Sequence, residues 1–203
     1  MTIQAFVFDC GGVLLRDGDA RIYKKWAERL GLTPEELGQR LWRGQVRGLA
    51  ERGQITDEEF WQRVGAELGL NEEAEIAALQ REMWDAWVVD EEVLRLIDRL
   101  DVRFRLALLS NATDALEGAL CDRYGVDDRF ETIVTSARVG MTKPEEGIYR
   151  EVLDQLQLEP QEVVFVDDRA ENVIAASALG MHIIWFVNSA ELERQLQVYL
   201  SKE

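Results

Sequence analysis

The stretch FVFDCGGVLL, residues 6–15, decides the fold of this chain of 203 residues. An apolar run meets a single aspartate, Asp9, and Cys10, Gly11 and Gly12 separate that aspartate from a second apolar run. An ionised carboxylate beside a buried strand is unfavourable by several kcal/mol unless a cation or hydrogen-bond donors compensate it. We therefore expect Asp9 to end a buried strand and to face a cation or a set of donors.

Further short apolar runs predict the other strands of the same sheet. Each run is too short to indicate a helix, and helix-length segments separate the later ones. The predicted strands are residues 3–8, 104–109, 132–134, 163–166 and 182–187, and the predicted helices between the later strands are residues 114–124, 144–156 and 171–179. This alternation predicts an α/β fold, a Rossmann-like parallel sheet with helices on both faces.

The stretch from about residue 19 to residue 89 differs from the rest of the chain, because we find helix signals there and no strand-like run. Thr33 and Thr56 each precede a glutamate by three residues, which is the pattern of a capping box at a helix start. The sequence therefore predicts a Rossmann-like catalytic core of residues 1–15 and 91–203. Residues 16–90 are expected to be an all-helical cap, inserted after the first strand and placed over one end of the sheet.

Composition restricts the partners of the protein. Lys and Arg total 23 against 39 Asp and Glu, a net charge of −16, so nucleic-acid binding is not expected. No apolar run approaches the roughly 20 residues that cross a membrane, so membrane insertion is not expected either. The 2 cysteines form no disulfide framework and the N-terminus resembles no targeting segment, which predicts a cytoplasmic protein. The composition leaves the oligomeric state open.

Polar residues follow several of the predicted strands at the point where each strand ends. They are Asp9 after the first strand, Ser110 and Asn111 after the second, Lys143 on the loop after the third, and Asp167 and Asp168 after the fourth. The carboxyl ends of parallel strands share one edge of the sheet, so these residues are expected to converge. Three neighbouring carboxylates favour a hard divalent cation, and Mg²⁺ fits best. The sequence thus predicts phosphoryl chemistry, with Lys143 neutralising charge and Ser110 donating to a phosphate oxygen.

Four stretches, FVFDCGGVL, ALLSN, VGMTKPEEGIY and VVFVDDRAENVIAASALGM, resemble the four motifs of the haloacid dehalogenase superfamily, in order and over nearly the whole chain. Within that superfamily the chain is similar to the small sugar-phosphate phosphatases. The resemblance implies that the helical segment is the cap of the family, placed between its first and second motifs. It also implies a Mg²⁺-dependent phosphatase of small phosphorylated metabolites.

The resemblance assigns roles to residues of this chain. Asp9 would be the nucleophile that forms an aspartyl-phosphate. The other implied roles are phosphate holding for Ser110 and Asn111, steadying of nucleophile and phosphate for Lys143, and Mg²⁺ binding for Asp168, with Asp167 beside it, and for the backbone carbonyl of Gly11. Asp9 would be a metal ligand as well.

Gly11 departs from the pattern of the family, whose phosphatases commonly place there a second aspartate that serves as general acid and base. Without that acid, substrates with good leaving groups are favoured, such as anomeric and aryl phosphates. The dehalogenases of the superfamily also lack this aspartate, so a 2-haloacid dehalogenase-type hydrolase is an alternative. The acidic pair Asp167 and Asp168 favours the phosphatase. Another alternative is a catalytically weak metabolite-binding or scaffold protein of the same fold.

The predicted cap carries two groups of residues that bear on the substrate. Arg43, Arg47 and Arg52 are candidates for contacts with the distal part of a substrate, or they are simply solvated. Aromatic residues at helical spacing most often form the core of a helical bundle, so we expect the tryptophans of this segment to be core residues, with a sugar-stacking surface as the alternative. They are Trp26, Trp42, Trp61, Trp84 and Trp87.

Overall fold

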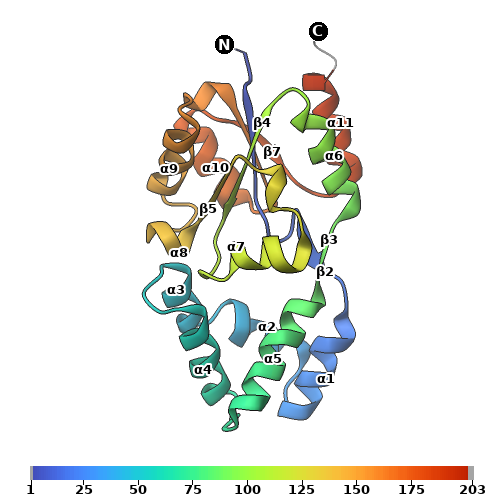
Figure 1. Ribbon diagram of the computed structural model, residues 1–203, viewed down its shortest axis with the longest axis vertical. Helices are drawn as coiled ribbons and strands as arrows, with labels where there is room; N and C mark the ends of the chain where they lie inside the picture. Colours follow the sequence, from blue (N-terminus) through green and yellow to red (C-terminus); the bar gives the residue numbers. More distant parts are fainter. Residues whose placement is uncertain (1, 201–203) are drawn as a thin grey trace.

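The computed structural model describes residues 2–200, which include a five-stranded parallel sheet with helices on both faces (Figure 1). The strand order is β5-β4-β1-β6-β7. The strands are β1 (Ala5–Phe8), β4 (Arg105–Ser110), β5 (Thr132–Thr135), β6 (Val163–Asp167) and β7 (His182–Trp185). The chain proceeds from β1 to one side through β4 and β5, then crosses to the other side through β6 and β7. The predicted α/β, Rossmann-like fold is confirmed.

Strand β1 is buried on both faces, which explains its continuous apolar run. Phe6 and Phe8 belong to one hydrophobic cluster, and Ala5 and Val7 belong to a second cluster on the opposite face. The first cluster is covered by α6 (Glu91–Asp101) and α11 (Ser189–Leu200), and the second by α9 (Glu146–Leu156) and α10 (Ala170–Leu179). The sheet therefore presents polar groups mainly at the ends of its strands.

Short elements connect the strands of the sheet. They are α7 (Leu116–Ala119), a π-helical turn (Leu120–Tyr124), a 3₁₀ turn (Asp127–Arg129), α8 (Ser136–Val139) and a second 3₁₀ turn (Pro160–Glu162). The predicted helix 114–124 is thus shorter than expected as an α-helix, because its last residues widen into the π-helical turn. Within the described residues, no helix is long and apolar enough to cross a membrane.

Residues 16–90, hereafter the helical insertion, lie beyond the carboxyl ends of the strands, opposite the two chain termini (Figure 1). The helices of the insertion are α1 (Ala20–Leu30), α2 (Pro34–Trp42), α3 (Gln45–Glu51), α4 (Asp57–Glu67) and α5 (Glu73–Ala86). Both predicted capping boxes are present: Thr33 begins α2 and Thr56 begins α4, each with its reciprocal glutamate. The helices pack around a hydrophobic cluster of their own, separate from the two clusters of the sheet.

A short antiparallel ribbon joins the insertion to the sheet. It consists of β2 (Leu15–Asp17) and β3 (Trp87–Val89), in which Leu15 pairs with Val89. The expectation that residues 16–90 are all helical is therefore wrong at both ends of the insertion, because β2 and β3 each extend into it. Both crossings between insertion and core pass through this ribbon.

Two further contacts hold the insertion against the core. Arg52, after α3, forms an ion pair with Glu145 at 2.6 Å. Gly53 has φ of +64°, and a Cβ atom at this position would collide with the carbonyl oxygen of Ala137 in α8. The close approach of α3 to α8 is visible in Figure 1. The structure is thus a closed conformation in which the insertion covers the strand ends.

Candidate active site

Asp9 follows β1 directly and is only 6% exposed. Its backbone N–H donates to the carbonyl of Val166 at 2.8 Å, which holds the residue at the edge of the sheet. Its carboxylate Oδ1 accepts from the backbone N–H of Cys10 at 2.6 Å and pairs with Lys143 Nζ at 2.8 Å. Burial raises the pKa of Asp9 to about 7, although Lys143 opposes the shift. Among the interactions of the described residues, those of this carboxylate go to Oδ1, which leaves Oδ2 available.

Lys143 is the cation that lies opposite Asp9. Its buried ammonium group contacts Asp9 Oδ1, Asp167 Oδ2 at 2.7 Å and the carbonyl oxygen of Leu109 at 2.9 Å. An ammonium has three protons, and these partners use all of them. Burial by itself would lower the pKa of Lys143, but the carboxylates outweigh it and the net shift is upward. Lys143 is therefore a permanent positive charge between two aspartates.

Asp167 is fully buried and its two oxygens are occupied. Besides Lys143, the side-chain nitrogen of Asn172 donates to both oxygens at 3.0 Å, and the backbone N–H of Arg169 donates to Oδ1 at 2.8 Å. We therefore interpret this carboxylate as a group that holds Lys143 in position, because its oxygens are already hydrogen-bonded and are poorly available as metal ligands.

Asp168 is exposed and completes a group of three carboxylates. One oxygen from each of Asp9, Asp167 and Asp168 lies within 4.8 Å of the others. Gly12 has φ of +89°, and a Cβ there would lie 2.5 Å from Asp168 Oδ2, so the turn after β1 needs a glycine to let this carboxylate approach. Burial, and then the charge of Asp167, raise the pKa of Asp168. Such a set of oxygen donors fits a hard divalent cation.

Ser110 and Asn111 come from the carboxyl end of β4. Ser110 is buried and lies on the wall of the cavity described below. Asn111 uses both ends of its amide on the main chain of Lys143: Nδ2 donates to the carbonyl at 2.9 Å, and Oδ1 accepts from the N–H at 2.7 Å. The structure thus brings together all the residues predicted at the strand ends, and it shows that the Asn111 side chain orients the Lys143 loop.

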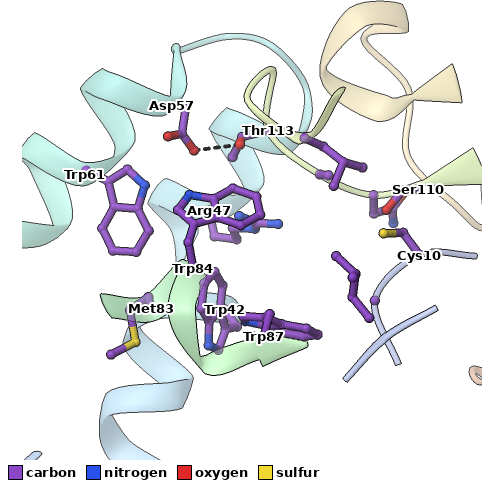
Figure 2. Close-up of a pocket in the computed structure, with 15 residues that line it drawn as sticks. Cys10, Trp42, Arg47, Asp57, Trp61, Met83, Trp84, Trp87, Ser110 and Thr113 are labelled. Atoms are coloured by element: carbon purple, nitrogen blue, oxygen red, sulfur yellow. Dashed lines mark hydrogen bonds between the residues drawn. The ribbon is translucent and has the colours of Figure 1, made fainter. Parts of the chain in front are cut away.

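A cavity of about 90 Å³ lies between these strand ends and the insertion (Figure 2). Gly11, Ser110 and Asn111 line one part of it. The insertion and its ribbon contribute an aromatic wall to the same cavity, made of Trp42, Trp61, Trp84 and Trp87. The expectation that the tryptophans are core residues is therefore incomplete: Trp26 is buried in the cluster of the insertion, whereas Trp61 belongs to both that cluster and the wall.

The three candidate arginines have different surroundings. Arg47 lines the cavity, where it donates to Glu51 at 2.8 Å and lies over the ring of Trp42. Arg52 forms the ion pair with Glu145 at the edge of the insertion. Arg43 follows α2 and is not among the described residues that line the cavity. The structure therefore places only Arg47 beside the candidate site.

Asp57 is a buried carboxylate on the cavity wall that sequence reasoning missed. Its Oδ1 accepts from the hydroxyl of Thr113 at 2.6 Å, its Oδ2 accepts from Gln80 at 2.9 Å, and its backbone N–H donates to Asp114 at 2.8 Å. Burial raises the pKa of Asp57. Asp57 directly follows Thr56 in the first turn of α4, where an acidic residue commonly complements the helix dipole, so no local pattern indicates this contact with the core.

Comparisons with known proteins agree with this geometry. The chain is 30% identical over 181 residues to a sesquiterpene phosphatase of Aspergillus oryzae, which covers 89% of this chain and 88% of that protein. It is 26% identical over 216 residues to a D-ribitol-5-phosphate phosphatase of Bacteroides thetaiotaomicron, covering 98% and 99% of the two chains. Other relatives are longer: the chain spans 36% of a drimenol cyclase of Aspergillus calidoustus and 39% of a bifunctional epoxide hydrolase of Mus musculus.

A solved structure has the same fold. It is an enzyme of the haloacid dehalogenase family from Bacteroides thetaiotaomicron, in complex with magnesium and inorganic phosphate, with a TM-score of 0.75 and 24% identity. The alignment covers 90% of this chain and 93% of that one. Residues 3–180 match the model of the haloacid dehalogenase-like hydrolases. With this match, and with an aspartate, a buried lysine and an acidic pair together at the strand ends, the chain belongs to the haloacid dehalogenase-like hydrolases.

Proposed function

We propose that the protein is a Mg²⁺-dependent phosphatase that hydrolyses small phosphorylated metabolites through an aspartyl-phosphate on Asp9. The observation that carries the proposal is the asymmetry of the Asp9 carboxylate, whose Oδ1 is held by Lys143 and Cys10 while Oδ2 is left available. A nucleophile needs this arrangement, with one oxygen fixed in place and the other directed at the reacting atom. The phosphatase names of two relatives that cover most of the chain support the same reaction.

The metal would be held by Asp9, Asp168 and the backbone carbonyl of Gly11. Asp167 lies near these groups, but Lys143, Asn172 and Arg169 already occupy its oxygens, so we assign it to positioning Lys143. Bound Mg²⁺ supplies positive charge that offsets the phosphate oxygens and the neighbouring carboxylates. The magnesium and phosphate in a structure of similar fold support this choice of metal.

The reaction then follows from the positions of the side chains. Asp9 Oδ2 attacks phosphorus, the bond from phosphorus to the ester oxygen breaks, and the departing alkoxide takes a proton from water. Lys143 holds Asp9 in place and faces the phosphate with its positive charge. The Ser110 hydroxyl donates to a phosphate oxygen, and Asn111 keeps the Lys143 loop in register. Water then attacks the phosphorus of the aspartyl-phosphate, which releases inorganic phosphate and restores Asp9. The closed insertion acts as a cap that limits the access of bulk water.

Gly11 supplies no proton to the departing alcohol. General acid catalysis contributes about 10²- to 10⁴-fold in typical enzymes, so substrates whose alcohol departs readily are favoured. Anomeric sugar phosphates and aryl phosphates are of this kind. The two relatives differ in the alcohol for which they are named, one a sesquiterpene and the other ribitol 5-phosphate. A sugar phosphate therefore stays a prediction.

The test is phosphate release from a panel of small phosphate monoesters, glucose 1-phosphate among them, with and without Mg²⁺. We expect turnover only with Mg²⁺ or a similar ion and none in the presence of a chelator. Asp9→Asn should abolish turnover and leave the unfolding transition close to that of the parent. Phosphate release in a chelator, or turnover by Asp9→Asn, would contradict the proposal. Halide release from a 2-haloacid, measured with the same preparation, reports on the dehalogenase alternative.

A further inference from the structure

The aromatic wall of the cavity determines what kind of alcohol the site can accept. Trp42 meets Trp61 and Trp87 edge to face, with ring centroids 6.3 and 6.1 Å apart. Figure 2 shows these rings with Trp84 and Met83 gathered on the side of the cavity formed by the insertion. Hydroxyl groups of a sugar enclosed by such a wall would lose hydrogen bonds to water and gain few in return. The wall therefore favours an apolar group.

The charged residues on the wall are already paired. Asp57 accepts from Thr113 and Gln80. Arg47 donates to Glu51, and its guanidinium carbon lies 5.3 Å from the centroid of the Trp42 ring. A ligand with many hydroxyls would have to compete with these partners, whereas an apolar ligand leaves them intact.

One polar atom on the wall has no partner. The indole nitrogen of Trp61 is buried and forms no hydrogen bond within residues 2–200, and the residue is only 3% exposed. In contrast, the indole nitrogens of Trp26 and Trp42 donate to Glu82 and Tyr23, each at 2.9 Å. Figure 2 shows the Trp61 nitrogen on the side of the ring that faces Trp84. A buried donor without an acceptor is unfavourable, so a ligand oxygen that accepts a hydrogen bond from this nitrogen would be stabilised there.

The volume of the cavity limits the size of the enclosed group. The cavity measures about 90 Å³ in this closed conformation. An apolar cavity of ~150 Å³ accommodates a benzene ring, so this one encloses a group of about four non-hydrogen atoms. Because Ser110 and Asn111 line the same cavity, that group would be the part of the alcohol closest to the phosphate.

We propose that the cavity binds a phosphate monoester of a short apolar alcohol that carries one hydrogen-bond-accepting oxygen, and that Trp61 Nε1 donates to this oxygen. The inference rests on the proposed phosphatase function and names its substrate class. Trp61 is then a residue that determines specificity, and the rings of Trp42, Trp84 and Trp87 exclude polyhydroxylated alcohols.

The experiment compares two esters of the same shape with a sugar phosphate. Isobutyl phosphate and 2-oxopropyl phosphate differ in one methyl group that a carbonyl oxygen replaces, and glucose 1-phosphate represents the sugars. Binding to Asp9→Asn in Mg²⁺ is followed by tryptophan fluorescence, so it is measured without turnover. Phosphate release by the parent enzyme is measured separately on the same three esters. We expect both short esters to bind at least tenfold more tightly than glucose 1-phosphate.

Trp61→Phe, made in the Asp9→Asn background for binding and in the parent for turnover, removes the donor and keeps an aromatic ring. This change should weaken binding of 2-oxopropyl phosphate roughly fivefold and leave isobutyl phosphate unchanged. Trp26→Phe is the matched control, because Trp26 lies in the same insertion, does not line the cavity and has its nitrogen paired with Glu82. It should leave the ratio between the two esters as it was.

The outcomes separate the inference from the function on which it rests. Equal or tighter binding of glucose 1-phosphate, or an equal effect of Trp61→Phe on both short esters, overturns the inference even if all three esters are hydrolysed. Failure of the parent enzyme to release phosphate from any ester, with the expected binding pattern intact, overturns the phosphatase function and leaves the assignment of the ligand in place.

Discussion

Lys143→Met tests the electrostatics of the site, because it replaces a buried ammonium by an apolar side chain of comparable length. The parent residue separates Asp9 and Asp167, whose carboxylates are 2.8 and 2.7 Å from Nζ. Removing one partner of a buried ion pair typically destabilises a protein by about 3–5 kcal/mol, since the remaining charge is left without compensation. For a chain of this length, each kcal/mol lowers Tm by roughly 2–4 °C, so a fall of about 6–20 °C is expected.

The loss of folding stability in Lys143→Met should also depend on pH, and the titration of Asp9 sets the direction of this dependence. Its pKa in the folded parent is about 7, well above the ordinary value of 3.8, so folding stability falls as pH rises until Asp9 is ionised near pH 7. Without Lys143 the pKa of Asp9 rises further, and stability continues to fall above pH 7 in the variant only. The gap between parent and variant should therefore widen above pH 7, by up to about 1.4 kcal/mol per pH unit.

The assay is urea denaturation between pH 6 and pH 9, followed by tryptophan fluorescence in the presence of a chelator. Lys25→Met is the matched control, because Lys25 forms an exposed ion pair with Glu82 at 2.7 Å. That control should change stability by less than about 1 kcal/mol at every pH. A gap for Lys143→Met that stays constant from pH 6 to pH 9, or a loss no larger than that of the control, would refute the reasoning.

Other predictions concern the metal, the missing acid and the cavity wall. Asp168→Asn should weaken Mg²⁺ binding, so that phosphate release recovers in part as Mg²⁺ is raised; an unchanged Mg²⁺ dependence would assign the ligand to Asp167. In Gly11→Asp the new Cβ would lie 3.8 Å from Trp87, an ordinary contact, so the variant should fold. It should accelerate esters of poor leaving groups by up to about 10²-fold, measured across a series of leaving-group pKa values. Asp57→Asn should gain stability relative to the parent as the pH rises above about 4 in denaturant titrations, because burial raises the pKa of Asp57 above its ordinary value of 3.8 and the ionised form is the unfavourable one.

Much of the core could be predicted because its signals are local. β1 and β6 are short and buried on both faces, so each reads as a continuous apolar run that ends at an aspartate. The rule that parallel strands share one edge then brings Asp9 and Lys143 together from opposite parts of the chain. β3 escaped prediction because its strand character depends on pairing with β2, far away in sequence.

The cavity wall could not be predicted for a different reason. Aromatic residues at helical spacing can face the core of a bundle or a cavity, and the sequence pattern is the same in both cases. Trp61 contacts both the core of the insertion and the cavity. The bond between Asp57 and Thr113 joins the insertion to the core across 56 residues, and nothing in either local sequence encodes it. Asn111 illustrates a third case. The sequence predicts its place at a strand end, but its side-chain partner, the main chain of Lys143, is visible only in three dimensions.

The contact at Gly53 has a consequence for turnover that none of the catalytic residues share. The backbone at this position contacts the carbonyl of Ala137 and leaves no room for a side chain. The close contact between the insertion and α8 therefore requires glycine here. A methyl group there would push the insertion away from the sheet and leave the site partly open, at a position remote from the residues proposed to react. We expect such a change to let more water into the site, to speed the release of the alcohol and to admit bulkier esters. If the protein turns over phosphate esters as proposed, we expect Gly53, at the rim rather than at the centre of the site, to influence the rate at which the product leaves.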